Sequence, residues 1–171
     1  MNVRFDCEDE ELRDGTVYAI QELYSGLIAL PIHITFSNKL SVNTGLHGIS
    51  YDDKLGKNHD ISLSLKDYNY FARGLSNKMC LQPWKELYSE HRRKKYPQLC
   101  WYCNIITHEL HHAWQSDLEY IRYEYDKIDK RRKHGLSPIA FQSISEYDAE
   151  VHAKKNCNKM FSLIKKGFKN G

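Results

Sequence analysis

The pattern HExxH occurs in Thr107-His-Glu-Leu-His-His112, where two histidines stand four residues apart. In a helix this spacing places the rings of His108 and His112 on one face, one turn apart, where they can bind the same cation. Glu109 is offset by about 100° around that helix, so its carboxylate lies near water at the metal without being a ligand. The pattern therefore predicts a zinc site at which Glu109 acts as the general base.

A zinc site that hydrolyses peptide bonds needs a third protein ligand and an open position for water. Glu146 is one candidate, because it shares a helical stripe with residues that are apolar except for Glu150. A buried carboxylate requires a partner, which a cation on a facing helix would supply. Glu150, one turn further on, is placed to accept a hydrogen bond from a ligand histidine. The stripe consists of Glu146, Ala149, Glu150, Ala153, Cys157, Met160 and Ile164.

Other polar residues compete for the third position. His134 follows a basic run in a connection that contains glycine, and it is the second candidate. Asp148 and His152 lie off the stripe and are weaker candidates. His111 is three residues from His108, but we expect it to face a neighbouring element or solvent.

At these residues the chain resembles the zincin metallopeptidases, and within them the gluzincins. The run His108-Glu-Leu-His-His112, followed by Glu146-Tyr-Asp-Ala-Glu150, is similar to the HExxH…ExxA pattern of minimal gluzincins and of ImmA/IrrE-type peptidases. The resemblance extends in architecture over residues 30–165. It implies that zinc is held by His108, His112 and Glu146, with Glu109 as the catalytic base. It also implies that an edge strand at about Gly48–Asp52 lies over the cleft and pairs with extended substrate.

A second resemblance leaves the third ligand open. His134-Gly135 with Phe141 is similar to the HG…F segment that supplies the third histidine in SprT-like proteases. The interval to Phe141 is longer than that pattern usually allows, and no zinc ribbon follows in the sequence. We therefore prefer Glu146 to His134.

The five cysteines are odd in number and lack the spacing of a disulfide framework, which favours a reducing compartment. Cys100-Trp-Tyr-Cys103 is a lone CxxC with no second pair to complete a four-cysteine site. It precedes an apolar helical pattern, so we expect both thiols to pack as small hydrophobic groups, with a redox or metal role as the alternative.

The length of 171 residues predicts one domain, residues 1–171, and 41% hydrophobic with 27% charged residues is typical of a globular chain. The acidic N-terminal segment has no apolar signal region, and no run is long enough to cross a bilayer, so we expect a cytoplasmic protein. A net charge of +3 does not by itself indicate nucleic-acid binding. Basic runs at 91–95, 130–133 and 165–166 favour solvated helix faces, with an acidic partner as the alternative.

Hydrophobic periodicity predicts an α+β fold of the zincin-like kind. We expect an N-terminal helix over 9–29, in which Gly15 weakens the first turn and allows a later start. A strand over 32–36 and a hairpin of strands 47–51 and 60–65, joined by a loose polar loop, should form a short antiparallel sheet. Helices over 99–130 and 143–166 should carry HExxH and Glu146 respectively.

These features together predict a zinc-dependent endopeptidase that hydrolyses peptide bonds of an intracellular protein substrate with a zinc-bound water and Glu109 as general base. The sequence does not choose the donor that stabilises the oxyanion among Tyr147, His152, His134 and the tyrosines of 120–125. The alternative is a non-catalytic zinc-binding module of the same fold that binds nucleic acid or a protein partner through its basic runs. The presence of Glu109 argues against it, because a structural zinc site needs no general base.

Overall fold

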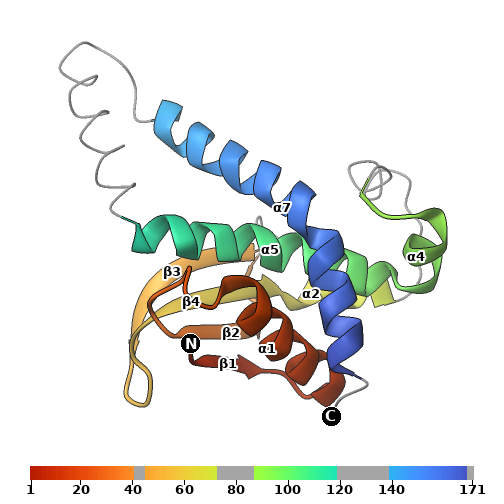
Figure 1. Ribbon diagram of the computed structural model, residues 1–171, viewed down its shortest axis with the longest axis horizontal. Coiled ribbons are helices and arrows are strands. Elements are labelled where there is room, and N and C mark those ends of the chain that lie inside the picture. Colours follow the sequence, from red (N-terminus) through yellow and green to blue (C-terminus); the bar gives the residue numbers. More distant parts are fainter. Residues whose placement is uncertain (41–44, 73–86, 119–138, 169–171) are drawn as a thin grey trace.

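The computed structural model describes residues 1–40, 45–72, 87–118 and 139–168, except for the side chains of 72 and 139–144. Its elements follow one another as shown in Figure 1. They are β1 (Val3–Asp6), α1 (Glu10–Tyr24), β2 (Ile32–Ser37), β3 (Gly45–Asp52), β4 (Gly56–Ser64), α2 (Leu65–Ala72), α4 (Glu90–Lys95), α5 (Pro97–Asp117) and α7 (Ile139–Gly167).

The four strands form one mixed sheet in the order β1-β2-β4-β3. β2 pairs in parallel with both β1 and β4, and only β3 is antiparallel to its neighbour β4. The α+β class is confirmed, but the expected antiparallel sheet is wrong. The parallel strand β1 was not predicted because it has only four residues and only one of them, Phe5, is buried. Such a short segment shows no alternation of apolar and polar residues in the sequence.

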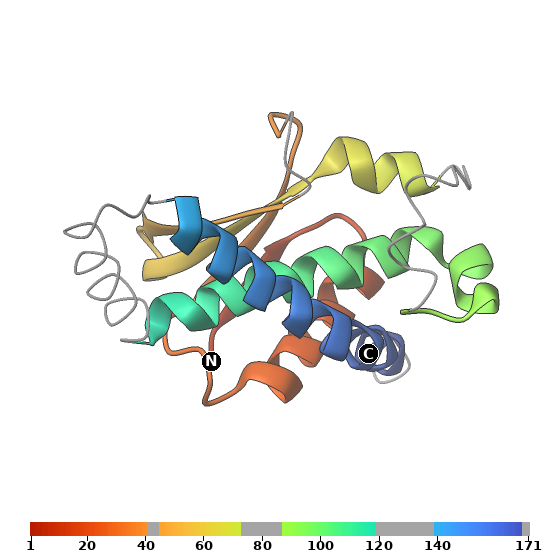
Figure 2. The same ribbon diagram turned by 90° about the horizontal axis from the view of Figure 1, so that it is seen from above.

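The helices α1, α5 and α7 lie together on one side of the sheet (Figures 1 and 2). Strands β2 and β4 turn alternate apolar side chains toward them, and these side chains are fully buried. The central part of this core consists of Ile32, Ile34, Ile61, Leu63, Trp101, Tyr102, Ile106 and Leu110. The HExxH segment therefore belongs to a helix whose buried side chains are part of the core between the helices and the sheet.

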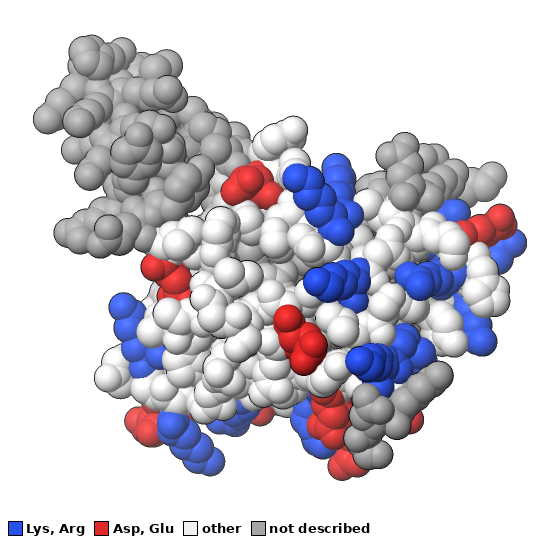
Figure 3. All heavy atoms as spheres, in the orientation of Figure 1, with Lys and Arg blue, Asp and Glu red and all other residues white. Residues whose placement is uncertain are grey.

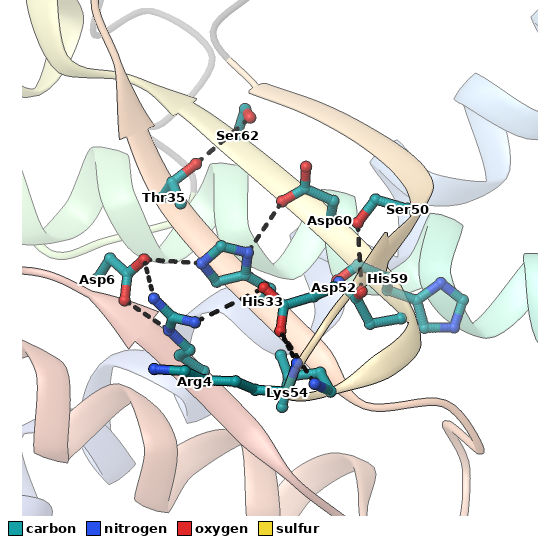
Figure 4. A network of polar contacts seen from close by, with 12 residues as sticks. Arg4, Asp6, His33, Thr35, Ser50, Asp52, Lys54, His59, Asp60 and Ser62 are labelled. Carbon is teal, nitrogen blue, oxygen red and sulfur yellow. Dashed lines mark hydrogen bonds and ion pairs between the residues drawn. The ribbon is translucent and has the colours of Figure 1, made fainter.

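The opposite face of the sheet carries a polar network (Figure 4). Arg4, His33 and Asp60 lie in register across β1, β2 and β4. Asp6 accepts hydrogen bonds from Arg4 and contacts His33 at 2.8 Å, and the second ring nitrogen of His33 is 3.6 Å from Asp60. Polar residues on one face and apolar residues on the other are typical of a sheet with one solvated face.

Helix α1 begins at Glu10, where the side chain of Asp9 accepts a hydrogen bond from the Leu12 amide at 3.0 Å. A start after Gly15 is therefore wrong. Gly15 is instead a packing residue, because a Cβ there would lie 2.7 Å from the carbonyl oxygen of Ile164 in α7. The absence of a side chain lets the two helices touch.

Three further boundaries differ from the expectation. Only residues 53–55 separate β3 from β4, and Asp52 closes this turn by accepting from the amides of Lys54 and Leu55, so the expected loose loop is wrong. Helix α5 ends at Asp117 rather than near residue 130, because Leu118 adopts an extended conformation. Helix α7 starts at Ile139, four residues earlier than predicted.

Candidate metal centre

Helices α5 and α7 bring together His108, His112 and Glu146 as a group that could hold a metal ion. The two Nε2 atoms of the histidines are 3.1 Å apart. Glu146 approaches them with one carboxylate oxygen each, at 3.2 Å from His108 and 3.4 Å from His112. Ala149 and Ala153 of α7 are small and fully buried, which allows the two helices to approach closely.

These distances are close to those between the ligands of a tetrahedral zinc ion. Ligand atoms at about 2.0–2.1 Å from zinc stand about 3.3 Å from one another. The two Nε2 atoms are 3.1 Å apart, and each lies 3.2–3.4 Å from a different oxygen of Glu146, so with one ligand atom from each residue the three atoms lie within 4.8 Å of one another. Two imidazoles and one carboxylate also form a donor set that zinc commonly takes, and three protein ligands leave a fourth position open.

Gln115 fixes the ring of His112 in the orientation that a metal ligand needs. Nδ1 of His112 is 2.9 Å from Oε1 of Gln115, whose amide nitrogen donates to Asp148 at 3.1 Å. Because the amide nitrogen is committed to the carboxylate, Oε1 faces His112 and holds the proton on Nδ1. Nε2 of His112 therefore keeps its lone pair for a cation. Sequence reasoning missed Gln115, although its place three residues after His112 is a usable signal.

The second nitrogen of His108 lies near Glu150, but the predicted hydrogen bond between them is not formed. Nδ1 is 3.8 Å from the carboxylate, which is longer than a hydrogen bond. Burial and the neighbouring His112 lower the pKa of His108, and the carboxylates of Glu146 and Glu150 oppose this change. The ring is thus disposed to remain neutral, as a ligand must be.

The stripe on α7 is less buried at its N-terminal end than predicted. The side chain of Glu146 is 55% exposed and that of Glu150 is 41% exposed, whereas the stripe is fully buried at Ala149 and from Ala153 onward. The premise of a buried carboxylate at 146 is therefore wrong. Glu146 lies where the interface between α5 and α7 opens to solvent, which leaves access for a ligand.

Glu109 is buried, and its carboxylate lies against the first residue of β3. Burial and the charge of Glu146 raise the pKa of Glu109 to about 8. A Cβ at Gly45 would lie 2.6 Å from Oε1 of Glu109, so only glycine leaves room for this side chain. Sequence reasoning did not single out Gly45. A carboxyl with a pKa near neutrality beside a candidate metal site is suited to proton transfer.

His111, Asp148 and His152 form a second cluster that joins α5, α7 and α1. Nε2 of His111 donates to Asp148 at 2.9 Å, and the ring stacks on His152 with centroids 4.3 Å apart. His152 is in turn 3.0 Å from the hydroxyl of Tyr24. Burial and His111 lower the pKa of His152 to about 4. The expectation that His111 faces a neighbouring element is confirmed, and these residues are occupied with one another.

Several sequence candidates fall elsewhere. Cys100 and Cys103 are buried free thiols, and burial raises the pKa of both, so the packing interpretation is confirmed. Tyr147 is exposed. His134, the tyrosines of 120–125 and the basic run 130–133 lie outside the described residues.

The two remaining basic runs converge on one face of the molecule. Lysine and arginine side chains gather over α4 and the C-terminal half of α7 (Figure 3). Lys95 and Lys165 lie over the same ring of Tyr96, at 5.3 and 4.7 Å from its centroid. Among the described helices, none has both the length and the apolar character that a membrane span requires.

Comparison of the chain with protein-family models, with curated proteins and with solved structures finds no match. The assignment of the site therefore depends on its geometry alone.

Proposed function

We propose that the protein is a zinc-dependent endopeptidase of the gluzincin type, in which His108, His112 and Glu146 bind zinc and Glu109 is the general base. The observation that supports this most directly is the convergence of the three side chains, whose ligand atoms lie within 4.8 Å of one another. Buried Glu109, one residue along α5 from His108, adds the group that a structural zinc site does not need.

Bound zinc would supply a Lewis acid that polarises a carbonyl group and lowers the pKa of water. Glu109 accepts the proton of the attacking water and passes it to the leaving amine. Gln115 keeps His112 in the tautomer that can bind zinc, and the exposed side of Glu146 leaves the site open to a polypeptide.

Strand β3 is the proposed binding edge for extended substrate. It is the last strand in the order of the described sheet, so one side of its backbone pairs with no other described strand and could pair with a peptide. Ile49 and Tyr51 lie on the same face of β3 as Gly45 and are 46% and 83% exposed. These side chains would contact apolar groups of a substrate that continues away from Glu109.

A non-catalytic zinc-binding module is the second candidate, and the basic face over α4 and α7 supports it. Lys95 and Lys165 from two distant runs meet at Tyr96, which would suit an acidic partner such as a nucleic acid. This candidate gives no role to buried Glu109, whose burial is costly in a module that performs no proton transfer.

The two candidates are separated by one set of proteins purified without a metal-affinity step. We expect about one zinc per chain in wild type and in Glu109→Gln, and far less in His112→Ala. Wild type should cleave members of a mixed peptide library, monitored by mass spectrometry, and Glu109→Gln should not. Glu90→Gln, an exposed carboxylate on α4, is the control and should match wild type. Zinc retained by His112→Ala, or equal cleavage by Glu109→Gln, would contradict the proposal.

A further inference from the structure

Positive charge is concentrated at one end of the molecule, although the whole chain carries only +3. In residues 1–72 the acidic residues outnumber the basic ones by eleven to six. Helix α4 has four basic residues and one acidic residue, and residues 151–168 include five lysines and no acidic residue. Arg92 of α4 donates a hydrogen bond to Asn158 of α7, so the cations of both helices belong to one basic surface (Figure 3).

Most lysines of this basic surface have no carboxylate partner in the described part of the chain. The exceptions are Lys94 and Lys154, which form ion pairs with Glu90 and Glu150 respectively. The charges of the others are not compensated by a described carboxylate, so they are available to an anion from outside the chain. These lysines are Lys95, Lys155, Lys159, Lys165 and Lys166.

The unpaired lysines form an elongated array. Lys155, Lys159 and Lys166 follow one another at intervals of four and seven residues on an exposed face of α7, so they extend about 16 Å along the helix axis. Lys95 and Lys165 lie beside this row, where the ring of Tyr96 between them holds both ammonium groups by cation–π contacts. Such an array fits a linear polyanion with evenly repeated charges better than it fits a compact acidic patch.

The surroundings of the array favour a nucleic-acid duplex as that polyanion. One strand of a duplex carries a phosphate about every 3.4 Å, so the row on α7 matches about five phosphates. None of the exposed large apolar side chains of the described chain comes from α4 or from residues 151–168, so the surface lacks the anchors of a membrane or protein interface. Arg92 lies over Phe161, which is buried, and Tyr96 is flanked by two lysines, so neither ring offers a platform for unpaired bases.

We infer that the basic surface binds the phosphate backbone of a nucleic-acid duplex without reading its sequence. Phosphate contacts from lysines position a protein on a duplex but carry no sequence information. Lys166 is twenty residues from Glu146 along α7, which corresponds to about 30 Å, so a duplex bound here leaves the candidate metal centre accessible. The inference goes beyond the proposed peptidase function and does not depend on it.

Salt-dependent binding of the full chain to fluorescent DNA duplexes of about 20 base pairs and two unrelated sequences tests the inference. The logarithm of the wild-type association constant should fall against the logarithm of salt concentration with a slope of about −4.5, because each of five phosphate contacts contributes about −0.9. Lys159→Gln/Lys166→Gln should reduce the size of this slope by about 2 and weaken binding at least tenfold at about 0.1 M salt. Lys95→Gln/Lys165→Gln should have a similar effect, and both duplexes should bind equally.

Two further variants separate charge at this surface from net charge and from folding. Lys159→Arg/Lys166→Arg keeps both charges and should bind like wild type. Lys54→Gln/Lys57→Gln removes two exposed lysines at the turn between β3 and β4, at the other end of the molecule from α4 (Figure 1), and should bind within about twofold of wild type. All variants should keep the zinc content and the urea midpoint of wild type.

The result that overturns the inference is specific to this surface. A wild-type slope near zero would do so, as would equal weakening by Lys159→Gln/Lys166→Gln and Lys54→Gln/Lys57→Gln. Tighter binding to polyglutamate or to phosphatidylserine vesicles than to the duplexes would assign the surface to another class of partner and would also overturn it. Peptide cleavage is measured separately, so wild type that binds duplex and cleaves no peptide contradicts only the proposed function.

Discussion

Replacement of Glu109 by glutamine should stabilise the metal-free protein in a manner that depends on pH. The folded state raises the pKa of Glu109 from 4.5 to about 8, so the native protein holds this proton more tightly than the unfolded chain does. Wild-type stability from this group is therefore complete below pH 4.5 and falls as pH rises toward 8. A difference of about 3.5 pKa units at about 1.4 kcal/mol each corresponds to a loss of up to about 5 kcal/mol above pH 8.

Urea unfolding of both proteins in the presence of a chelator measures this effect. The glutamine side chain does not titrate, so the free energy of unfolding of Glu109→Gln relative to wild type should rise by about 4 kcal/mol between pH 5 and pH 9. Groups that titrate in both proteins cancel in this difference. With zinc bound, the cation favours the ionised carboxylate, and the pH dependence of the difference should become small.

Glu150→Gln is the matched control, because Glu150 is a neighbouring carboxylate with a side chain 41% exposed. Its difference from wild type should remain within about 1 kcal/mol across the same pH range. If the difference in the free energy of unfolding between Glu109→Gln and wild type is equally independent of pH in the metal-free protein, the surroundings of Glu109 do not disfavour its ionised form. The reasoning that assigns Glu109 a proton-transfer role from its environment would then be refuted.

Three further outcomes test the site. Gly45→Ala should lose about 1–3 kcal/mol of stability, because its Cβ would meet Glu109 and Ile105 within 2.8 Å, whereas Gly48→Ala has nothing within 4 Å and should be nearly neutral in urea unfolding. Gln115→Ala should weaken zinc binding about 10–100-fold in competition with a chelator; affinity equal to wild type would mean that Gln115 does not orient His112. Glu146→Ala should lose zinc and melt at a lower temperature while His134→Ala keeps both, and the opposite result would favour the SprT-like assignment.

Sequence patterns located the parts of the site that depend on a single element. The spacing of His108, Glu109 and His112 predicts their relation because all three stand on one rigid helix with 3.6 residues per turn. The same periodicity identified α7 and the stripe that brings Glu146 to the histidines. The premise about that stripe was nevertheless incorrect, since periodicity shows which residues share a face but not where the facing helix diverges.

Other features arose only from long-range packing. β1 is too short to show a pattern, and its parallel pairing with β2 follows from the way α1 crosses over the sheet. Gly45 was not singled out from the sequence, yet a glycine is required there by the carboxylate of Glu109, on a helix that comes much later in the chain.

The side-chain contacts of buried His59 with His47 on β3 and with Asp117 at the end of α5 illustrate the same limit. Each residue gives no signal in its own segment, because a histidine on a strand or an aspartate at a helix end has many ordinary uses. The sequence by itself determined the metal-binding pattern, since ligands one helical turn apart need no tertiary contact to share a face. The tertiary structure alone decided which side chains from other elements reach that pattern, because strand order and helix crossing set distances that local periodicity does not contain.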